Sequence, residues 1–155
     1  MLPMVTQPAE LDDVRALLEA AVHGLRTAGV ACAVPGLGMM VEVPAAAIAI
    51  DGFRAAFFSI GSNDLIQYVT ACSRDSGRLA ALSDPLQPAV LRLIREVAEY
   101  GASVSIDVSL CGDMASDARC LPALLAAGVR SLSIAPAALA RVKAQIARFG
   151  GAIGG

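Results

Sequence analysis

Short apolar runs alternate with helical patterns along this chain, and that order restricts its fold more than any other feature of the sequence. Runs rich in apolar or β-branched residues predict five strands, at about 2–6, 38–43, 57–61, 104–110 and 131–134. Strands separated by helices are typical of βα units around a parallel sheet. From runs such as FFSIG we expect strands that are buried on both faces.

Long helices are predicted where apolar residues recur every three or four positions. They cover about residues 8–28, 88–100 and a last segment that opens at Pro136, and a proline stands near the start of each. No linker divides the chain. We therefore expect one domain over residues 1–149, followed by a flexible glycine-rich tail at 150–155. The apolar stripe of the first helix consists of Leu11, Val14, Leu18, Val22 and Leu25.

The composition fits one globular domain and excludes several classes of protein. Of the 155 residues, 56% are hydrophobic and 17% are charged, which gives enough apolar surface for a core. The longest stretch without a charge, 27–41, has 15 residues, whereas a membrane-spanning helix needs about 20. The N-terminus does not read as a signal peptide, so we expect a cytoplasmic protein. A net charge of -2 provides no basic surface for nucleic acid.

The side chains available for chemistry are carboxylates, arginines and thiols. The chain has one histidine, His23, and one lysine, Lys143, which excludes metal sites built from several histidines and argues against covalent lysine chemistry. Its four cysteines do not have the spacing of a CxxC redox motif or a zinc site.

Polar residues stand at the carboxyl ends of three predicted strands. Glu42 lies at the end of MMVEV, Asn63 and Asp64 follow FFSIG, and Cys111 follows VSL. In parallel βα folds these strand ends meet at one edge, where the loops gather the reactive groups. The sequence therefore predicts a functional site at this edge.

Each of these residues also has a purely structural interpretation. Glu42 is a carboxylate within an apolar strand, and it either binds Mg²⁺ with a second carboxylate, pairs with Arg74, or caps the turn before Pro44. Asp64 lies either near a bound phosphate or in the N-terminal cap of a helix. Cys111 is either a catalytic thiol or an inert one.

Longer motifs indicate a known family. They are GMMVEVPAAA, FFSIGSNDLIQY, Arg74 ten residues after Asp64, DPLQPAVLRLI and LCGDMASD. With these motifs in the family's order, the chain resembles the C-terminal phosphoenolpyruvate-binding barrel of enzyme I of the bacterial sugar phosphotransferase system, from about residue 2 to residue 147. DPLQPAVLRLI and CGDMA favour this branch over phosphoenolpyruvate synthase and pyruvate phosphate dikinase.

The resemblance implies an α/β fold, a partial TIM barrel of about five parallel βα units, which binds phosphoenolpyruvate with Mg²⁺. By motif, Glu42 and Asp64 match the family's metal ligands, and Asn63, Asp64 and Arg74 match the groups that hold the substrate. Cys111 matches the acid that protonates the enolate carbon to give pyruvate. An ordinary thiol is protonated at neutral pH and can serve as such a donor.

The sequence also departs from the family. Ser73 replaces the usual aspartate before the arginine, Ile66 replaces a threonine, and Asp113 replaces a glutamate. A full barrel has eight βα units, and the family's phosphohistidine lies on a separate swivelling domain. We therefore expect an incomplete enzyme, completed by a homodimer partner or a complementing N-terminal barrel segment, that phosphorylates a carrier protein.

Two other functions stay open at the level of sequence. The chain is either this part of a transferase, which the resemblance links to bacterial sugar transport, or a non-catalytic module that senses phosphoenolpyruvate or dimerises. A fragment of a phosphoenolpyruvate synthase or pyruvate phosphate dikinase is the third interpretation.

Overall fold

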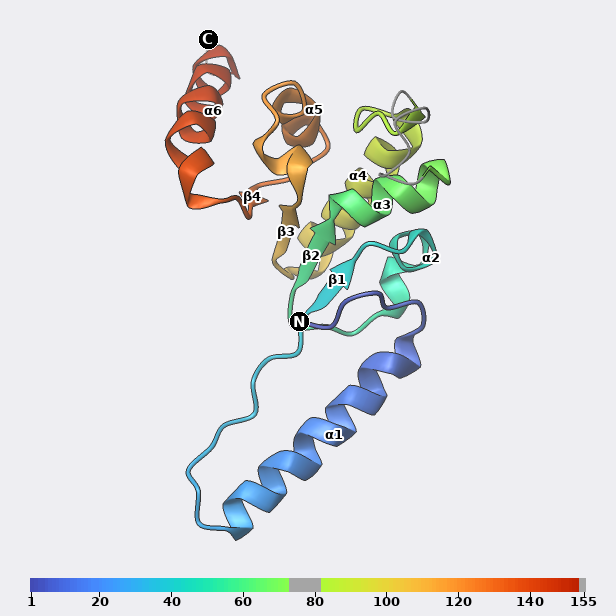
Figure 1. The fold of residues 1–155 in the computed structure, drawn as a ribbon, viewed down its shortest axis with the longest axis vertical. Coiled ribbons are helices and arrows are strands. Elements are labelled where there is room, and N and C mark those ends of the chain that lie inside the picture. Colours follow the sequence, from blue (N-terminus) through green and yellow to red (C-terminus); the bar gives the residue numbers. More distant parts are fainter. Residues whose placement is uncertain (73–81, 154–155) are drawn as a thin grey trace.

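The computed structural model describes residues 1–72 and 82–153. They form a parallel sheet with strand order β1-β2-β3-β4, together with helices (Figure 1). Strands that follow one another in the chain are also neighbours in the sheet, and every pair is parallel. The predicted α/β class, with helices between parallel strands, is confirmed. The strands are β1 (Met39–Val41), β2 (Phe58–Gly61), β3 (Val108–Cys111) and β4 (Ser131–Leu132).

The first segment does not form the strand predicted at 2–6. Leu2 alone makes a parallel bridge to β1, in which its N–H donates to the carbonyl of Gly38 at 2.8 Å and its carbonyl accepts from the N–H of Met40 at 2.8 Å. Met4 then has a φ of 55°, in the left-handed region, which turns the chain out of the strand direction. Leu2 therefore takes the fifth position of the sheet without a strand.

The strand predicted at 104–110 starts later and ends later. Helix α4 (Pro88–Val104) takes up the first residue of that range, and Ser105 ends the helix in a left-handed conformation with φ 57°. The strand begins only at Val108 and extends through Cys111. Cys111 is therefore the last residue of β3 and is fixed by its ladder. The other three predicted strands are present but shorter.

The two faces of the sheet differ, which corrects the expectation of strands buried on both faces. The register places Ser59, Ser109 and Ser131 in one row on one face. Ser59 is buried, Ser109 is half-buried and Ser131 is exposed, so only β2 is buried on both sides. The other face packs against the helices through the buried residues Met39, Val41, Phe58, Ile60 and Leu110.

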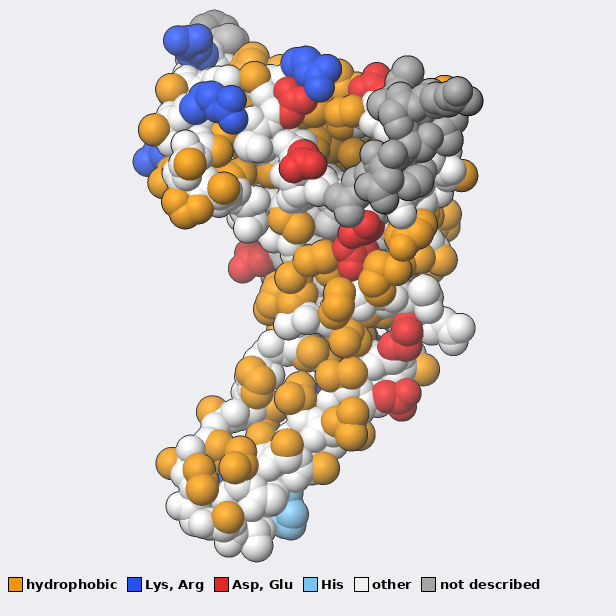
Figure 2. All heavy atoms as spheres, in the orientation of Figure 1, with side chains coloured by type: hydrophobic (Ala, Val, Ile, Leu, Met, Phe, Trp, Pro, Cys, Tyr) orange, Lys and Arg blue, Asp and Glu red, His pale blue; other side chains and the backbone are white. Residues whose placement is uncertain are grey.

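Helix α1 (Pro8–Thr27) confirms the first predicted helix but lies away from the sheet. It projects from the body as an arm, and the segment 28–37 returns to β1 (Figure 1). Only Leu11 and Val22 of the five stripe residues are buried, and Leu25 is 43% exposed. Hydrophobic side chains consequently appear along the surface of the arm (Figure 2).

The start of α1 is fixed by one carboxylate. Oε2 of Glu10 accepts the N–H of Thr6 at 2.6 Å and the N–H of Gln7 at 2.7 Å. Glu10 thereby satisfies backbone donors next to the first turn. The hydrogen bonds from the Gln7 and Thr6 backbone also lower the pKa of Glu10.

The remaining helices connect and cover the strands. The last predicted helix is observed, but it continues through residues 150–153, the first part of the segment expected to be a flexible tail. Residues 154–155 lie outside the described residues, so the division at 149 stays a prediction. The α-helices are α2 (Pro44–Ile48), α3 (Ser62–Thr70), α5 (Leu121–Ala126) and α6 (Leu139–Ile153), with 3-10 helices at Ile50–Gly52, Asp113–Ser116 and Pro136–Ala138.

Gly101 allows α4 to lie directly on β3, and this contact can be tested. A Cβ at Gly101 would overlap Cγ2 of Val108 and lie 2.9 Å from the carbonyl oxygen of Ile106. We expect Gly101→Ala to lower the free energy of unfolding by about 1–3 kcal/mol through overpacking. Gly24→Ala is the matched control, because no atom lies within 4 Å of the added methyl group in α1.

The control should raise the free energy of unfolding by up to about 1 kcal/mol, since alanine is the better helix former. Urea unfolding of the two variants and the parent chain measures both values. Equal effects of the two substitutions would contradict the close packing of α4 on β3.

Candidate active site

Strands β1, β2 and β3 end at the same edge of the sheet, because they run parallel and in register. Glu42 directly follows β1, Asn63 and Asp64 lie in the first turn of α3 directly after β2, and Cys111 ends β3. Four of the five predicted site residues therefore lie at the carboxyl edge. The fifth, Arg74, lies outside the described residues.

Glu42 is nearly sealed from solvent at this edge. Glu42 is only 4% exposed, and its Oε1 accepts a hydrogen bond from the backbone N–H of Met4 at 2.8 Å. It does not cap the turn before Pro44, because the following helix has no side-chain cap. Within residues 1–72 and 82–153, no basic side chain forms an ion pair with Glu42. The pairing with Arg74 stays a prediction.

Gly61 lies between Glu42 and Cys111 on the sheet. A Cβ at Gly61 would lie 2.6 Å from Oε2 of Glu42, and the Cα of Gly61 pairs with that of Cys111 across the ladder. Side chains of paired residues stand on the same face of a sheet. The carboxylate of Glu42 and the thiol of Cys111 therefore flank Gly61 on one face.

Asn63 has its side-chain amide oriented by the neighbouring loop. Oδ1 of Asn63 accepts the N–H of Asp113 at 2.9 Å, which leaves the Nδ2 hydrogens as donors on the other side of the amide. Asp64 lies one residue further along the first turn of α3, where the helix dipole stabilises a carboxylate. Asp64 is not the N-cap residue, because Gly61 takes that position.

Ser62 joins the ends of β2 and β3. Its hydroxyl is fully buried and donates to the carbonyl oxygen of Cys111 at 2.7 Å. The next residue, Gly112, has φ 97°, and a Cβ there would overlap Oγ of Ser62 and lie 2.7 Å from Oδ1 of Asn63. The two loops can approach this closely only because residue 112 is a glycine.

The thiol of Cys111 has two hydrogen-bond partners on β2. Its Sγ lies 3.5 Å from the carbonyl oxygen of Ile60, to which it donates, and 3.8 Å from Oγ of Ser59, from which it accepts. Cys111 is half-buried, whereas Cys120 is fully buried. Burial raises the pKa of the Cys120 thiol to about 11, which makes that thiol unreactive at neutral pH.

Sequence reasoning missed Ser59, Ser62 and Met4 as parts of this edge. Ser59 is the polar residue within the apolar run FFSIG, and that isolated hydroxyl was the available signal. Ser62 occurs within the motif FFSIGSNDLIQY, but no residue pattern there indicates its contact with Cys111. The contribution of Met4 is a backbone N–H, which no residue pattern reveals.

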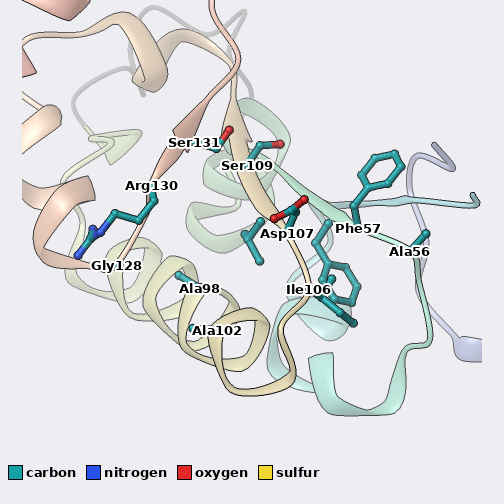
Figure 3. Close-up of a pocket in the computed structure, with 12 residues that line it drawn as sticks. Ala56, Phe57, Ala98, Ala102, Ile106, Asp107, Ser109, Gly128, Arg130 and Ser131 are labelled. Atoms are coloured by element: carbon teal, nitrogen blue, oxygen red, sulfur yellow. The ribbon is translucent and has the colours of Figure 1, made fainter.

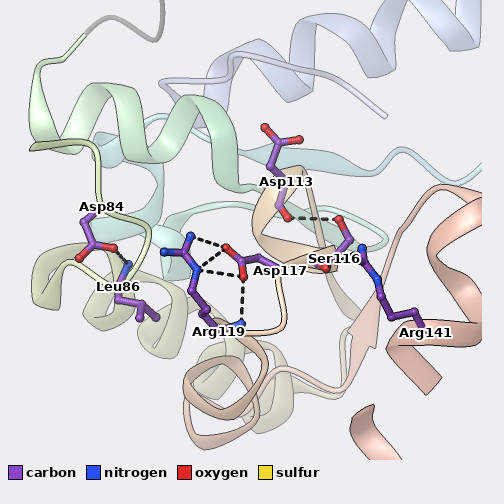
Figure 4. A network of polar contacts seen from close by, with 7 residues as sticks. All are labelled: Asp84, Leu86, Asp113, Ser116, Asp117, Arg119 and Arg141. Carbon is purple, nitrogen blue, oxygen red and sulfur yellow. Dashed lines mark hydrogen bonds and ion pairs between the residues drawn. The ribbon is translucent and has the colours of Figure 1, made fainter. Parts of the chain in front are cut away.

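A cavity of about 210 Å³ with a mixed polar and apolar lining adjoins the edge beside Asn63 and Asp113. Asp117 and Arg119 also line it, and Nη2 of Arg119 lies 2.6 Å from Oδ2 of Asp117 (Figure 4). The hydrogen bond from the Arg119 side chain lowers the pKa of the Asp117 carboxyl. The charge of Arg119 is therefore already neutralised by its neighbour.

A larger cavity, of about 690 Å³, lies at the opposite end of the strands (Figure 3). Its lining includes Phe57, Asp107 and Arg130, which precede β2, β3 and β4. None of the four predicted site residues that the structure describes lines it. Since the reactive loops of a parallel sheet gather at the carboxyl ends of its strands, we assign the site to that edge despite the smaller cavity there.

Comparison with known proteins identifies the class of domain. The sequence profile of the PEP-binding domain of PEP-utilising enzymes, where PEP is phosphoenolpyruvate, matches residues 1–150. The chain therefore belongs to the family of PEP-utilising enzymes and is a PEP-binding domain of that family.

The relatives are phosphotransferases. The chain is 40% identical over 153 residues to the phosphoenolpyruvate-protein phosphotransferase of Geobacillus stearothermophilus, covering 96% of this chain and 26% of the relative. It is 38% identical over 146 residues to a protein of Salmonella typhimurium named phosphoenolpyruvate-dependent phosphotransferase system, covering 92% and 20%. The chain thus spans a fifth to a quarter of the length of these relatives.

A solved structure supports the fold. The crystal structure of a citrate lyase from Burkholderia xenovorans superposes with a TM-score of 0.58 at 22% identity, over 93% of this chain and 47% of that chain. The prediction of a partial TIM barrel is confirmed at the level of fold. Within the described residues, no helix is long and apolar enough to cross a membrane.

The close approach of the two loops at Gly112 can be tested against another glycine with positive φ. We expect Gly112→Ala to lower the free energy of unfolding by about 1–3 kcal/mol more than Gly29→Ala does. Both alanines would be strained, because φ is 97° at Gly112 and 75° at Gly29, but no atom lies within 4 Å of a Cβ at Gly29. Urea unfolding measures the difference, and equal losses would contradict the close contact with Ser62.

Proposed function

We propose that this chain is the C-terminal part of a phosphoenolpyruvate-protein phosphotransferase. In this proposal it binds phosphoenolpyruvate at the carboxyl edge and protonates the enolate to pyruvate while the phosphate passes to a histidine on another domain. The observation that carries the proposal is the placement of Glu42 and Cys111 on either side of Gly61, on one face of the sheet. The names of the relatives support the reaction class.

The residues at the edge fit a magnesium ion. Oε2 of Glu42 lies over Gly61, where a side chain would fill the space, and Asp64 provides a second carboxylate at the end of the neighbouring strand. Mg²⁺ is commonly held by one or two carboxylates together with water and substrate phosphate. No cluster of three or more His, Cys, Asp or Glu residues occurs in the described part of the chain, so the proposed site depends on these two carboxylates. When bound, Mg²⁺ would neutralise charge on the phosphoryl group.

Asn63 and Arg74 would hold the phosphate of the substrate. The Nδ2 group of Asn63 is available to donate, since Asp113 fixes Oδ1. Arg74 would add a planar, permanently charged guanidinium, which suits phosphate oxygens. Its role depends on the motif alone, because it lies outside the described residues.

Cys111 would act as the acid. Its half-buried thiol is at the end of β3, and its proton is held by the Ile60 carbonyl rather than exposed freely to water. A protonated donor at this place can deliver a proton to the methylene carbon of the enolate. Phosphoryl transfer itself requires positioning and charge neutralisation, which are the roles proposed for the other side chains.

The phosphate acceptor would be a histidine outside this chain. His23 is exposed on α1, the arm that projects from the sheet, so it does not lie at the carboxyl edge. A swivelling phosphohistidine domain and a carrier protein would complete the reaction in the cytoplasm, in support of sugar uptake. A second copy or an N-terminal barrel segment would complete the barrel.

A chimera tests the whole proposal. The matching 153 residues of the Geobacillus stearothermophilus relative are replaced by this chain. We expect transfer of phosphate from phosphoenolpyruvate to a carrier histidine, with release of pyruvate. Binding of phosphoenolpyruvate without pyruvate release would instead support a sensor, and ATP formation from phosphoenolpyruvate, AMP and phosphate would support the synthase or dikinase branch.

In this chimera we expect Glu42→Gln to lower the rate of pyruvate formation about a hundredfold, because one stabilising charge near the transferring phosphate is lost. The Mg²⁺ concentration for half-maximal rate should also rise. Glu99→Gln removes the same charge from the exposed face of α4 and should leave both quantities unchanged. A Glu42→Gln variant with the parent's Mg²⁺ dependence would remove Glu42 from the metal site.

We expect Cys111→Ala to slow incorporation of deuterium from solvent into the methyl group of pyruvate by about a hundredfold or more, because the proton donor is absent. Binding of phosphoenolpyruvate to the chimera should persist, as calorimetry would measure. Cys32→Ala removes a half-buried thiol elsewhere in the chain, and this variant should incorporate deuterium into pyruvate at the parent rate. Unchanged exchange in Cys111→Ala would exclude this thiol as the acid.

A further inference from the structure

Ser59 is a buried hydroxyl whose partner is the candidate catalytic thiol. It is the second residue of β2 and is 5% exposed. Its Oγ donates to Sγ of Cys111 at 3.8 Å, and within the described residues no other hydrogen bond is formed by that hydroxyl. Burial of a hydroxyl disfavours folding unless a partner compensates it. The hydrogen bond to the Cys111 thiol therefore compensates the cost of burying the Ser59 hydroxyl.

The strand register makes this contact specific. Ser59 pairs with Ser109, and Gly61 pairs with Cys111, so Ser59 and Cys111 are diagonal neighbours on the same face. The sulfur accepts from the hydroxyl of Ser59 and donates to the carbonyl oxygen of Ile60, which lies 3.5 Å away. Cys111 thus has one donor and one acceptor partner, both on β2.

We propose that Ser59 is a positioning residue for Cys111, which holds the sulfur in place and donates a hydrogen bond to the thiolate that proton transfer leaves behind. This inference rests on the proposed function. In the step, the S–H bond of Cys111 breaks and its electron pair stays on sulfur. The proton forms a C–H bond at the methylene carbon of the enolate, whose oxygen becomes the carbonyl of pyruvate. Ser59 keeps its own proton.

The two partners of the thiol serve different protonation states. Before transfer, the S–H group can donate to the carbonyl of Ile60, which stabilises the protonated thiol. After transfer the sulfur has no proton to donate and faces that carbonyl oxygen unfavourably, whereas the Ser59 O–H still points at it. Hydrogen bonds to an ionised acceptor are roughly twice as strong as neutral ones. The hydrogen bond from Ser59 to the sulfur is therefore stronger after proton transfer than before it.

The first test uses this chain without any substrate. The rate at which iodoacetamide alkylates Cys111 at fixed pH is followed by mass spectrometry of the Cys111 peptide, since the thiolate is the reacting form. We expect Ser59→Ala to slow alkylation about tenfold, because a hydrogen bond to the charged form is lost. Loss of the hydroxyl also opens space at the sulfur, which on its own would speed the reaction. A slower rate therefore reports the hydrogen bond and not access.

Three controls accompany this measurement. Ser109→Ala removes the neighbouring hydroxyl in the same row, which forms no hydrogen bond with the thiol in the described structure, and should leave the rate unchanged. Alkylation of Cys32 in the same samples should not differ between variants. Ser59→Thr keeps the hydroxyl and should restore the rate to within about threefold of the parent. An unchanged or faster rate in a folded Ser59→Ala variant overturns the proposal.

The second test uses the chimera. We expect Ser59→Ala to lower kcat for pyruvate formation about tenfold while KM for phosphoenolpyruvate stays within about twofold, because the hydrogen bond strengthens only as the thiolate forms. A rise in KM with unchanged kcat overturns the proposal. If the parent chimera forms no pyruvate but alkylation still slows in Ser59→Ala, the proposed function fails while the contact between Ser59 and the thiolate stands.

Discussion

The candidate site depends on the absence of a side chain at Gly61. Glu42 reaches over this residue from β1, and Cys111 pairs with it from β3, so any Cβ there would collide with the carboxylate. Parallel register brings the three strand ends together, and the glycine lets the groups they carry share one face. The buried hydroxyl of Ser62 donates a hydrogen bond to the carbonyl oxygen of Cys111, which joins the ends of β2 and β3. A carboxylate and a thiol thereby lie on the same face, on either side of Gly61, although 69 positions separate them in the chain.

The parts of the fold that the sequence predicted are those set by local pattern. Apolar runs between helical patterns gave the parallel strands, and the rule that strand ends gather at one edge located Glu42, Asn63, Asp64 and Cys111. These inferences need only the order of elements along the chain. The boundaries were less accurate: α4 runs to Val104 because a left-handed cap, and not a change in hydrophobicity, ends it.

What the sequence could not predict depends on contacts between distant segments. Met4 leaves the strand direction in a left-handed conformation, and its N–H satisfies Glu42 38 positions away. Ser59 reads as a lone polar residue in an apolar run until the register shows that it faces Cys111. Helix α1 has a regular stripe, yet only two of its five residues are buried, since the stripe shows which face is apolar but not whether another element lies against it.

Burial within the site follows the shape of the sheet and matches the chemistry of each group. The N-terminal segment lies along the outer edge of β1, to which Leu2 forms a bridge. Glu42 and Ser59 are buried polar residues of the site, at 4% and 5% exposed. Charge interactions are strongest there, because the local dielectric is low. Cys111, one strand further, is half-buried and can meet a substrate, while Ser131 at the last strand is exposed. Glu42, a carboxylate proposed to bind the metal ion, is thus shielded, whereas Asp64 is half-buried, and the group proposed to donate a proton remains within reach of the substrate.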